Sequence, residues 1–400
     1  MQISTAQLAS WCTLVGLMVA ASGTWTACAS TKDRSDTVSV SPDLFGSDEP
    51  RLREEVIGDI LAHTGPYVVE PAVGVFVTEA RLLHAAVRTW SLDRDDMSRA
   101  AAQDQWRVTM LAWQYLEGMQ FGPAGSEYLA GGHGLRDEIY SWPWSSSCRV
   151  DQVLVYADWS ESSFFEDPPP YSAYGLDAIE YLLFESSTEN TCPDSVDINA
   201  DGTWDALGDE AIARARAEMA TVLVENVVEV GTELYEGWSD GFSASLAGGS
   251  DAQSVEALNT MFYAMRYMES YVLIGKLCHP LGLSGCPDEP ISPDDFEHIR
   301  SMISTEAVHS NLLGFRDLFT GRSGAGLDDL LVWSGYGSLA DDFLMELDEA
   351  IGLAAGPDFT SDDARVLELY EEVQDVTVLL FGDIATVLTL RNPSGLPMGG

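Results

Sequence analysis

Apolar residues recur at spacings of three and four through most of the chain, and this periodicity limits the fold more than any other feature. Such spacing places apolar side chains on one face of an α-helix, whereas strands require alternation at a spacing of two. Breaks rich in Gly, Pro and Asp separate the periodic segments, and strand-like segments are scarce. We therefore predict helices over residues 51–63, 71–90, 97–120, 206–246, 255–277, 293–319, 339–354 and 364–390.

The helical segments fall into two successive sets, separated by a polar stretch over residues 193–205. The chain has 400 residues, of which 46% are hydrophobic, and this is enough for one large or two ordinary globular domains. Helices that each bury one apolar face are stable when they pack as bundles. We therefore predict an all-α fold of two helical-bundle domains packed side by side, over residues 51–200 and 201–392.

The chain is strongly acidic, with 64 Asp and Glu against 20 Lys and Arg and a formal net charge of −44. Its lysines are Lys32 and Lys276. Such a charge disfavours binding to nucleic acid or to anionic lipid surfaces, because both need basic patches. It concentrates cations near the surface, although a solvated acidic surface also keeps a protein soluble. We therefore expect no nucleic-acid partner, and we expect membrane contact through a lipid anchor only.

An apolar run over residues 8–21 lies close to the N-terminus. It is too short to span a bilayer comfortably, and small residues follow it, which is the layout of a signal peptide. The segment ends in Trp25-Thr26-Ala27-Cys28, which resembles the bacterial lipobox. Trp25 stands where leucine is usual, and no Lys or Arg precedes the apolar run. An ordinary cleaved signal peptide is therefore the alternative.

This pattern predicts a lipoprotein signal peptide over residues 1–27 and lipidation of Cys28. Residues 28–50 are rich in Ser, Asp, Thr and Pro, a composition typical of a flexible tether. The expected location is the bacterial cell envelope, with the lipid-anchored chain facing the periplasm or the cell surface.

Cys12 lies in the predicted signal peptide and Cys28 is the predicted lipid site, which leaves Cys148, Cys192, Cys278 and Cys286. An even number of cysteines in an exported chain favours disulfides, and three pairings are possible. Because residues 278–286 form a short loop rich in Pro and Gly, we predict Cys278–Cys286 and, with it, Cys148–Cys192. A zinc site is the alternative, but the chain contains no C-x-x-C motif.

Residues 172–184 contain two carboxylates, Asp177 and Glu180, three positions apart in a segment with helical periodicity. That spacing places both on one face of a helix. The apolar residues of the same segment would pack it into a core, so the pair lies at the edge of a buried stripe. A charge there needs a partner, a hydrogen bond or a bound cation. A solvated acidic pair is the simpler interpretation of an isolated D-x-x-E.

Four segments around this pair carry a recognisable pattern. They are Y-L-E-G-M-Q-F-G-P at 115–123, L-R-D-E-I-Y-S-W-P at 135–143, C-R-V-D at 148–151 and G-L-D-A-I-E at 175–180. Their order and approximate spacing resemble those of the imelysin-like proteins, and weaker similarity continues over residues 259–268 and 306–319. The R-D-x-I-Y-S-W-P segment is long and aromatic, so it is more specific than G-x-x-x-x-E alone.

The resemblance implies an all-α fold of two four-helix-like domains, an envelope location, often as a lipoprotein, and an association with iron uptake. An envelope protein that takes part in iron uptake is the corresponding partner. The resemblance also implies a ligand site in a cleft between the domains. The residues that match the motifs and would form this site are Glu117, Arg136, Asp137, Tyr140, Trp142, Asp177 and Glu180.

One departure from the family pattern affects the expected chemistry. Imelysin-like proteins characteristically carry G-x-H-x-x-E, and in this chain Asp177 stands at the histidine position. The change removes a borderline nitrogen ligand and adds a hard oxygen donor. With Glu180 and Glu117, Asp177 would form a metal site suited to a divalent or ferric ion, iron or calcium, with Arg136 as the counterion. A degenerate site is the alternative, in which Glu117 and Arg136 make a structural buried pair.

Three function classes follow from these residues. The first is a non-enzymatic envelope lipoprotein that binds a metal ion or a small-molecule ligand in the cleft, with a role in iron uptake. The second is a metal-dependent peptidase of the imelysin type, and the third is a structural or interaction module with a degenerate site. No H-E-x-x-H, G-x-S-x-G or P-loop motif is present, so hydrolysis rests on the family resemblance alone.

Two further pairs have the i, i+3 spacing that carboxylate–histidine metal sites use in helical bundles. They are Asp295 with His298 and Glu306 with His309. Capping and surface roles are the simpler interpretation, and we assign neither pair to the site.

Overall fold

Helices account for the regular structure of this chain. The computed structural model describes residues 51–156, 159–161, 163–166, 169–283, 297–322, 324–356 and 364–392. Every regular element within these residues is a helix, so the predicted all-α fold is confirmed. They lie in one compact unit, Val40–Gly400. The domain boundary at residue 200 stays a prediction, and the predicted signal peptide and tether lie outside the described residues.

The first helical run is continuous from Arg53 to Asp93. It consists of α2 (Arg53–His63), the π-helical turn η1 (Thr64–Val69) and α3 (Glu70–Asp93). The sequence predicted a break in this stretch, because Pro66 lacks the N–H that a helix interior requires. The wider π-turn accommodates the proline, and the Glu70 N–H bonds to the Gly65 carbonyl five residues earlier.

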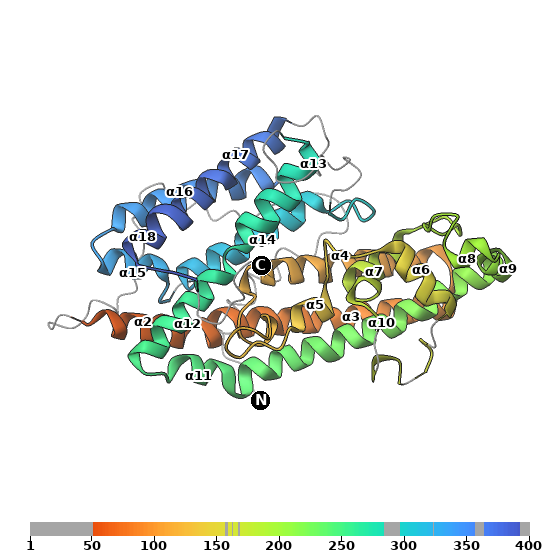
Figure 1. Ribbon diagram of the computed structural model, residues 1–400, viewed down its shortest axis with the longest axis horizontal. Helices are drawn as coiled ribbons and strands as arrows, with labels where there is room; N and C mark the ends of the chain where they lie inside the picture. The colour runs from red at the N-terminus through yellow and green to blue at the C-terminus, as the bar shows by residue number, and fades with distance from the viewer. Residues whose placement is uncertain are drawn as a thin grey trace. The chain divides into compact units, whose positions relative to one another are not determined.

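Helix α3 forms the centre of the first half of the fold. Helices α4 (Asp96–Leu116) and α10 (Asp209–Gly237) both pack along it (Figure 1). The Arg53–Asp93 run is long and apolar enough to span a membrane, but 56% of its most apolar window is buried inside the fold. This burial is what a core helix of a bundle requires.

Short helices connect α4 to α10 and carry the imelysin-like motifs. The 3-10 turn η2 (Glu117–Met119) continues α4, and α7 (Leu176–Phe184) packs on α4 and α10. Trp106 of α4 holds the start of α7, because its Nε1–H donates to the Leu176 carbonyl at 2.9 Å. The other elements of the connection are η3 (Gly122–Ala124), α5 (Leu135–Ile139), α6 (Ser147–Tyr156), η4 (Phe164–Glu166), η5 (Tyr171–Ala173), α8 (Asp197–Ala200) and α9 (Thr203–Leu207).

A disulfide joins Cys148, at the start of α6, to Cys192, in the segment after α7. This predicted pairing is therefore confirmed. Cys278 is buried and disulfide-bonded. Its predicted partner Cys286 lies outside the described residues, so that pairing stays a prediction. The predicted lipid site, Cys28, also lies outside them.

The second half of the fold docks on α4 through α14 (Ser304–Thr320). Gly314 permits this close contact, because an added Cβ would lie 1.8 Å from the Tyr115 carbonyl oxygen. Helix α16 (Gly337–Ala354) packs between α14 and α17 (Ala364–Val378) (Figure 1). The other elements are η6 (Trp238–Phe242), α11 (Ser243–Ala247), α12 (Asp251–Ala264), η7 (Met268–Cys278), α13 (His279–Leu281), α15 (Leu327–Trp333), η9 (Leu379–Ile384) and α18 (Ala385–Val387).

The helix predicted over residues 293–319 begins later in the structure, at Ser304. Residues 297–303 instead form turns, in which His298 and Met302 have left-handed φ angles of 63° and 56°. A right-handed helix excludes this conformation, so α14 cannot extend back through them. The change matters for function, because these turns carry His298 to Glu180 of α7 and Glu297 to Lys276 of η7.

Candidate functional site

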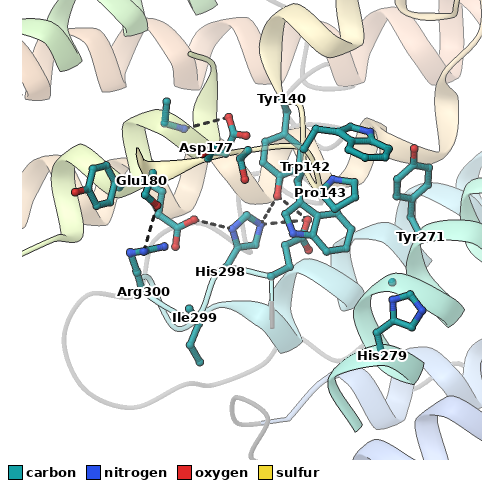
Figure 2. Close-up of a pocket in the computed structure, with 18 of the residues that line it drawn as sticks. Tyr140, Trp142, Pro143, Asp177, Glu180, Tyr271, His279, His298, Ile299 and Arg300 are labelled. Carbon is teal, nitrogen blue, oxygen red and sulfur yellow. Dashed lines mark hydrogen bonds and ion pairs between the residues drawn. The ribbon is translucent and has the colours of Figure 1, made fainter. Parts of the chain in front are cut away.

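A cavity of about 650 Å³ lies where the motif-bearing connection meets the turns before α14 (Figure 2). Its walls come from the segment after α5, the starts of α6 and α7, the helix η7 and the turns at 297–300. The polar and aromatic residues that shape its chemistry are Tyr140, Trp142, Asp177, Glu180, His298 and Arg300.

Asp177 lies in the first turn of α7 and faces this cavity (Figure 2). Gly175 allows the start of α7 to lie close to the backbone of Ile139. It has a φ of 90°, and an added Cβ would lie 2.8 Å from the Ile139 carbonyl oxygen. The Asp177 Oδ2 accepts a hydrogen bond from the Ser141 hydroxyl at 3.0 Å, and Oδ1 accepts one from the Ala178 N–H at 3.1 Å. Both donors are neutral.

The environment of Asp177 disfavours its ionised form. Burial by the surrounding protein raises the pKa of this carboxyl to about 7, although the hydrogen bonds from Ser141 and Ala178 oppose the shift. Within the described residues, no basic side chain forms an ion pair with it. Near neutral pH, Asp177 is therefore a carboxyl that a cation in the cavity would help to ionise.

Glu180 lies one turn further along α7 and has different partners. Its Oε2 lies 3.1 Å from the His298 Nδ1, and its Oε1 accepts a hydrogen bond from the Ser301 N–H at 3.0 Å. The His298 ring is stacked against Tyr140 and meets the edge of Trp106. Both oxygens of Glu180 are thus used to hold the turns before α14 against α7.

Glu297, which lines the cavity, forms a buried ion pair with Lys276, with Nζ 2.9 Å from Oε2. Lys276 also donates to the Gln114 Oε1 and the Asn311 Oδ1, each at 2.7 Å. The other oxygen of Glu297 accepts from the Tyr140 hydroxyl at 2.7 Å. All three donors of the ammonium are therefore satisfied, which a buried charge requires.

The pKa directions follow from burial and from these partners. Burial lowers the pKa of Lys276, and Glu297 opposes that shift. Burial alone would raise the pKa of Glu297, but Lys276 and His298 reverse it and lower the value. Burial alone would lower the pKa of His298, but Glu297 and Glu180 raise it. Burial and the Glu297 carboxylate raise the pKa of Tyr140, so its hydroxyl stays protonated and donates.

Glu117 and Arg136 form a second buried pair, with Nη2 3.0 Å from Oε2. Glu117 is fully buried, at 0% exposure, in the turn after α4. Arg136 also donates to Asp137 at 3.0 Å and to the Trp142 carbonyl at 3.1 Å. The Arg136 guanidinium therefore anchors the segment that supplies Trp142 to the cavity.

The family profile described as Imelysin, peptidase M75, matches residues 71–375, which is more than half of the chain. The chain belongs to the imelysin family. The resemblance recognised in the motifs is therefore confirmed.

Two solved structures share this imelysin fold. A protein from Parabacteroides distasonis, described as an iron-regulated protein A precursor, aligns with a TM-score of 0.64 and 17% identity, covering 86% of this chain and 97% of that chain. An imelysin-like protein from Psychrobacter arcticum aligns with a TM-score of 0.57 and 18% identity, covering 85% of this chain and 98% of that chain. No curated protein matches the chain.

The structure separates the predicted site residues of this imelysin-family chain into two groups. Asp177, Glu180, Tyr140 and Trp142 line the cavity. The other three, Glu117, Arg136 and Asp137, are not among its lining residues, and they bond to one another instead. The structural alternative for Glu117 and Arg136, a buried pair, is what the structure shows.

The predicted metal ligands Glu117, Asp177 and Glu180 therefore do not form one cluster. The group of three carboxylates that the described residues do bring within 4.8 Å is elsewhere, on α16 and α17, and consists of Glu346, Glu349 and Glu372. A metal-binding role of Asp177 and Glu180 stays a prediction.

Sequence reasoning missed the residues that lie opposite α7, namely Glu297 and His298, which line the cavity, and Lys276, which pairs with Glu297. Lys276 and Glu297 were not considered, and His298 was noted at metal-ligand spacing from Asp295 but interpreted as a capping or surface residue. Asp295 lies outside the described residues. One signal was available: Lys276 is one of two lysines in the chain, and it interrupts an apolar helical segment.

Proposed function

We propose that this imelysin-family protein is a non-enzymatic binding protein of the cell envelope, and that its cavity holds a cationic ligand through Asp177. One observation carries the proposal. Among the acidic residues that line the cavity, Glu180 and Glu297 each have a basic partner, whereas Asp177 accepts hydrogen bonds from neutral donors. A cation that enters the cavity would find its charge complement at Asp177.

A metal ion is the first ligand to test. Carboxylate oxygen suits a hard ion such as calcium or ferric iron, and Asp177 would be its protein ligand with Glu180 beside it. Iron is the first metal to test, because one structural neighbour is described as an iron-regulated protein. A role in iron uptake, with an envelope partner, would follow from iron binding at this residue.

The family designation as a peptidase is the argument for hydrolysis. The residues present do not favour it, because the two nitrogens of His298 face Glu180 on one side and Gln114, Tyr140 and Glu297 on the other. A histidine-based zinc shell with an open position is therefore not formed by this imidazole. A degenerate site that binds nothing is the remaining alternative.

The test is calorimetric titration of the purified protein with calcium, iron and zinc, repeated with Asp177→Asn. Asp341→Asn is the matched control, because Asp341 is an exposed acid on α16. We expect binding by the wild type and the control, and a loss of binding in Asp177→Asn. Equal isotherms for all three proteins would refute the role of Asp177. A peptidase assay on the metal-loaded protein separates the enzymatic alternative.

The envelope location rests on the sequence before residue 51. We propose that Cys28 carries a lipid and that residues 28–50 tether the helical fold to a membrane. Mass spectrometry of the mature N-terminus tests this, and an unmodified chain that begins beyond Cys28 would contradict it.

A further inference from the structure

The cavity beside Asp177 is larger than a metal ion needs. Its volume of about 650 Å³ lies within the range of roughly 300–1,000 Å³ that is typical of pockets for organic molecules. An ion held by protein oxygens requires a small shell of ligands that surrounds it closely, not an open space of this size. The size of the cavity therefore favours an organic ligand.

The carboxylate oxygens available in the cavity also favour an organic cation over a metal ion. Calcium takes about six to eight oxygen ligands, and protein sites supply several of them from carboxylates. Both oxygens of Glu180 already accept hydrogen bonds, from His298 and Ser301. Glu297 is held by Lys276 and Tyr140. The described part of the cavity thus offers one carboxylate without a basic partner, Asp177, which suits a single positive charge.

Aromatic rings also line this cavity, among them those of Tyr140, Trp142 and Tyr271 (Figure 2). The ring centroids of Trp142 and Tyr271 are 6.3 Å apart, at an interplanar angle of 53°. Gly275 leaves room for the indole, since an added Cβ would lie 2.9 Å from Trp142 Cη2. Aromatic faces attract organic cations and pack against their apolar parts.

Basic residues near these aromatic rings do not repel a cation strongly, because each is paired. Lys276 Nζ lies 5.7 Å from the Trp142 ring and is matched by Glu297. Arg136 lies 5.5 Å from the Tyr271 ring and is matched by Glu117.

Arg300, which lines the cavity itself, donates to the Ser147 hydroxyl at 3.3 Å, and its Nε lies 4.0 Å from Glu185. Its charge is thus also shared with an acidic residue. The sign of charge that the cavity prefers is therefore set by Asp177.

We propose that the ligand of this cavity is a small organic molecule with a protonated amine, which places the amine on the Asp177 carboxylate and its apolar body against Trp142 and Tyr271. The inference rests on the proposed cation-binding function and names its ligand class. No bond is made or broken in this binding step.

The experiment compares matched probes on the same protein. Phenethylamine carries the amine and an aromatic body, 2-phenylethanol has a similar shape without the charge, and calcium and ferric iron are bare ions. Each is titrated into the purified full chain, with binding followed by calorimetry and by tryptophan fluorescence. We expect phenethylamine to bind and 2-phenylethanol to bind far more weakly or not at all.

Three variants connect the binding to the residues. Asp177→Asn should weaken phenethylamine binding by roughly 10- to 100-fold, as expected for the loss of a charge-assisted hydrogen bond. Trp142→Leu should weaken it by roughly threefold to tenfold, because it removes the aromatic face. Asp341→Asn should leave it unchanged. Far-ultraviolet circular dichroism verifies that each variant is folded.

The outcomes separate this inference from the proposed function. If the bare ions bind in an Asp177-dependent manner and the amine does not, the function stands and the ligand class is wrong. If amine and alcohol bind equally, the charge of Asp177 is not recognised and the inference is wrong. If neither the amine nor the ions bind at millimolar concentration, both the inference and the proposed function fail.

Discussion

Two groups of carboxylates in this molecule lie in opposite surroundings. Behind and beside the cavity, Glu117, Glu180 and Glu297 are buried, and each faces a basic side chain at 2.9–3.1 Å. On α16 and α17, Glu346 and Glu372 are half-buried and Glu349 is exposed, and these three lie within 4.8 Å of one another. Within the described residues, no basic side chain pairs with this second group.

The difference shows how a chain with 64 acidic and 20 basic residues places its few cations. An unpaired charge costs several kcal/mol in a core but little where water screens it. The basic residues Arg136, Arg216 and Lys276 are buried, and each lies beside a buried carboxylate. The surface group relieves its repulsion by holding a proton instead: burial and a hydrogen bond with Glu346 raise the pKa of Glu372 to about 7.

The strongest test of this comparison removes a buried cation. Lys276→Met should destabilise the fold by about 3–5 kcal/mol, because it leaves the Glu297 carboxylate buried without its partner. Urea denaturation measures the change. The matched control is Arg266→Met, which breaks the exposed pair with Glu269 and should cost less than about 1 kcal/mol.

The double variant Lys276→Met with Glu297→Gln sharpens the interpretation. It removes both charges, so it should recover part of the stability that Lys276→Met loses. Equal losses of stability for Lys276→Met and Arg266→Met would show that burial does not decide how much an ion pair stabilises this fold.

The second test uses His298, whose charge depends on pH. Glu297 and Glu180 raise the pKa of His298 despite burial, so the imidazole stabilises the fold fully below its unfolded pKa of 6.5. This stabilisation is lost as pH rises through the higher folded pKa. His298→Gln should therefore destabilise the fold more at pH 5.5 than at pH 9. Chemical denaturation at the two pH values measures it, and a cost independent of pH would contradict the assignment.

The third test concerns Asp177, the cavity carboxyl without a basic partner. Because its pKa is raised from 3.8 to about 7, the folded state binds its proton more tightly than the unfolded state. The free-energy cost of ionising Asp177 in the folded protein is absent below pH 3.8 and complete above about pH 7. Asp177→Asn removes it and should stabilise the ligand-free protein at pH 8 by about 1–2 kcal/mol, after allowance for partial exposure.

Thermal or urea unfolding of both proteins at pH 4 and pH 8 measures this change. At pH 4 the gain should largely disappear. A variant that is less stable than the wild type at pH 8 would mean that Asp177 is held by an attractive interaction in the free protein, and the proposed ligand site would lose its main support.

The smallest effect is expected for the surface group. Glu372→Gln relieves repulsion from Glu346 and Glu349, and it should stabilise the fold above pH 7 by less than about 1 kcal/mol because water screens these charges. High salt should reduce the gain further. A gain as large as that of Asp177→Asn would show that exposure does not separate the two groups of carboxylates.

Much of the local structure was predictable from the sequence. Asp177 and Glu180 lie on one face of a helix, as their spacing predicted, because helical hydrogen bonds join residues four apart and leave a local pattern. The Cys148–Cys192 bridge followed from the number of cysteines and a short local loop. Prediction failed locally at Pro66 and at residues 297–303, where a π-turn and left-handed backbone angles replaced the expected break and helix.

The partners of the buried carboxylates were decided by the tertiary structure. Glu180 meets His298 across 118 positions of the chain, and Lys276 meets Gln114 across 162. No local periodicity encodes such contacts, since they arise from how α4, α7, η7 and the turns before α14 pack together. The sequence by itself thus determined the helices and the family. Packing decided that Glu117 is buried in an ion pair with Arg136, whereas Asp177 faces the cavity without an ion-pair partner.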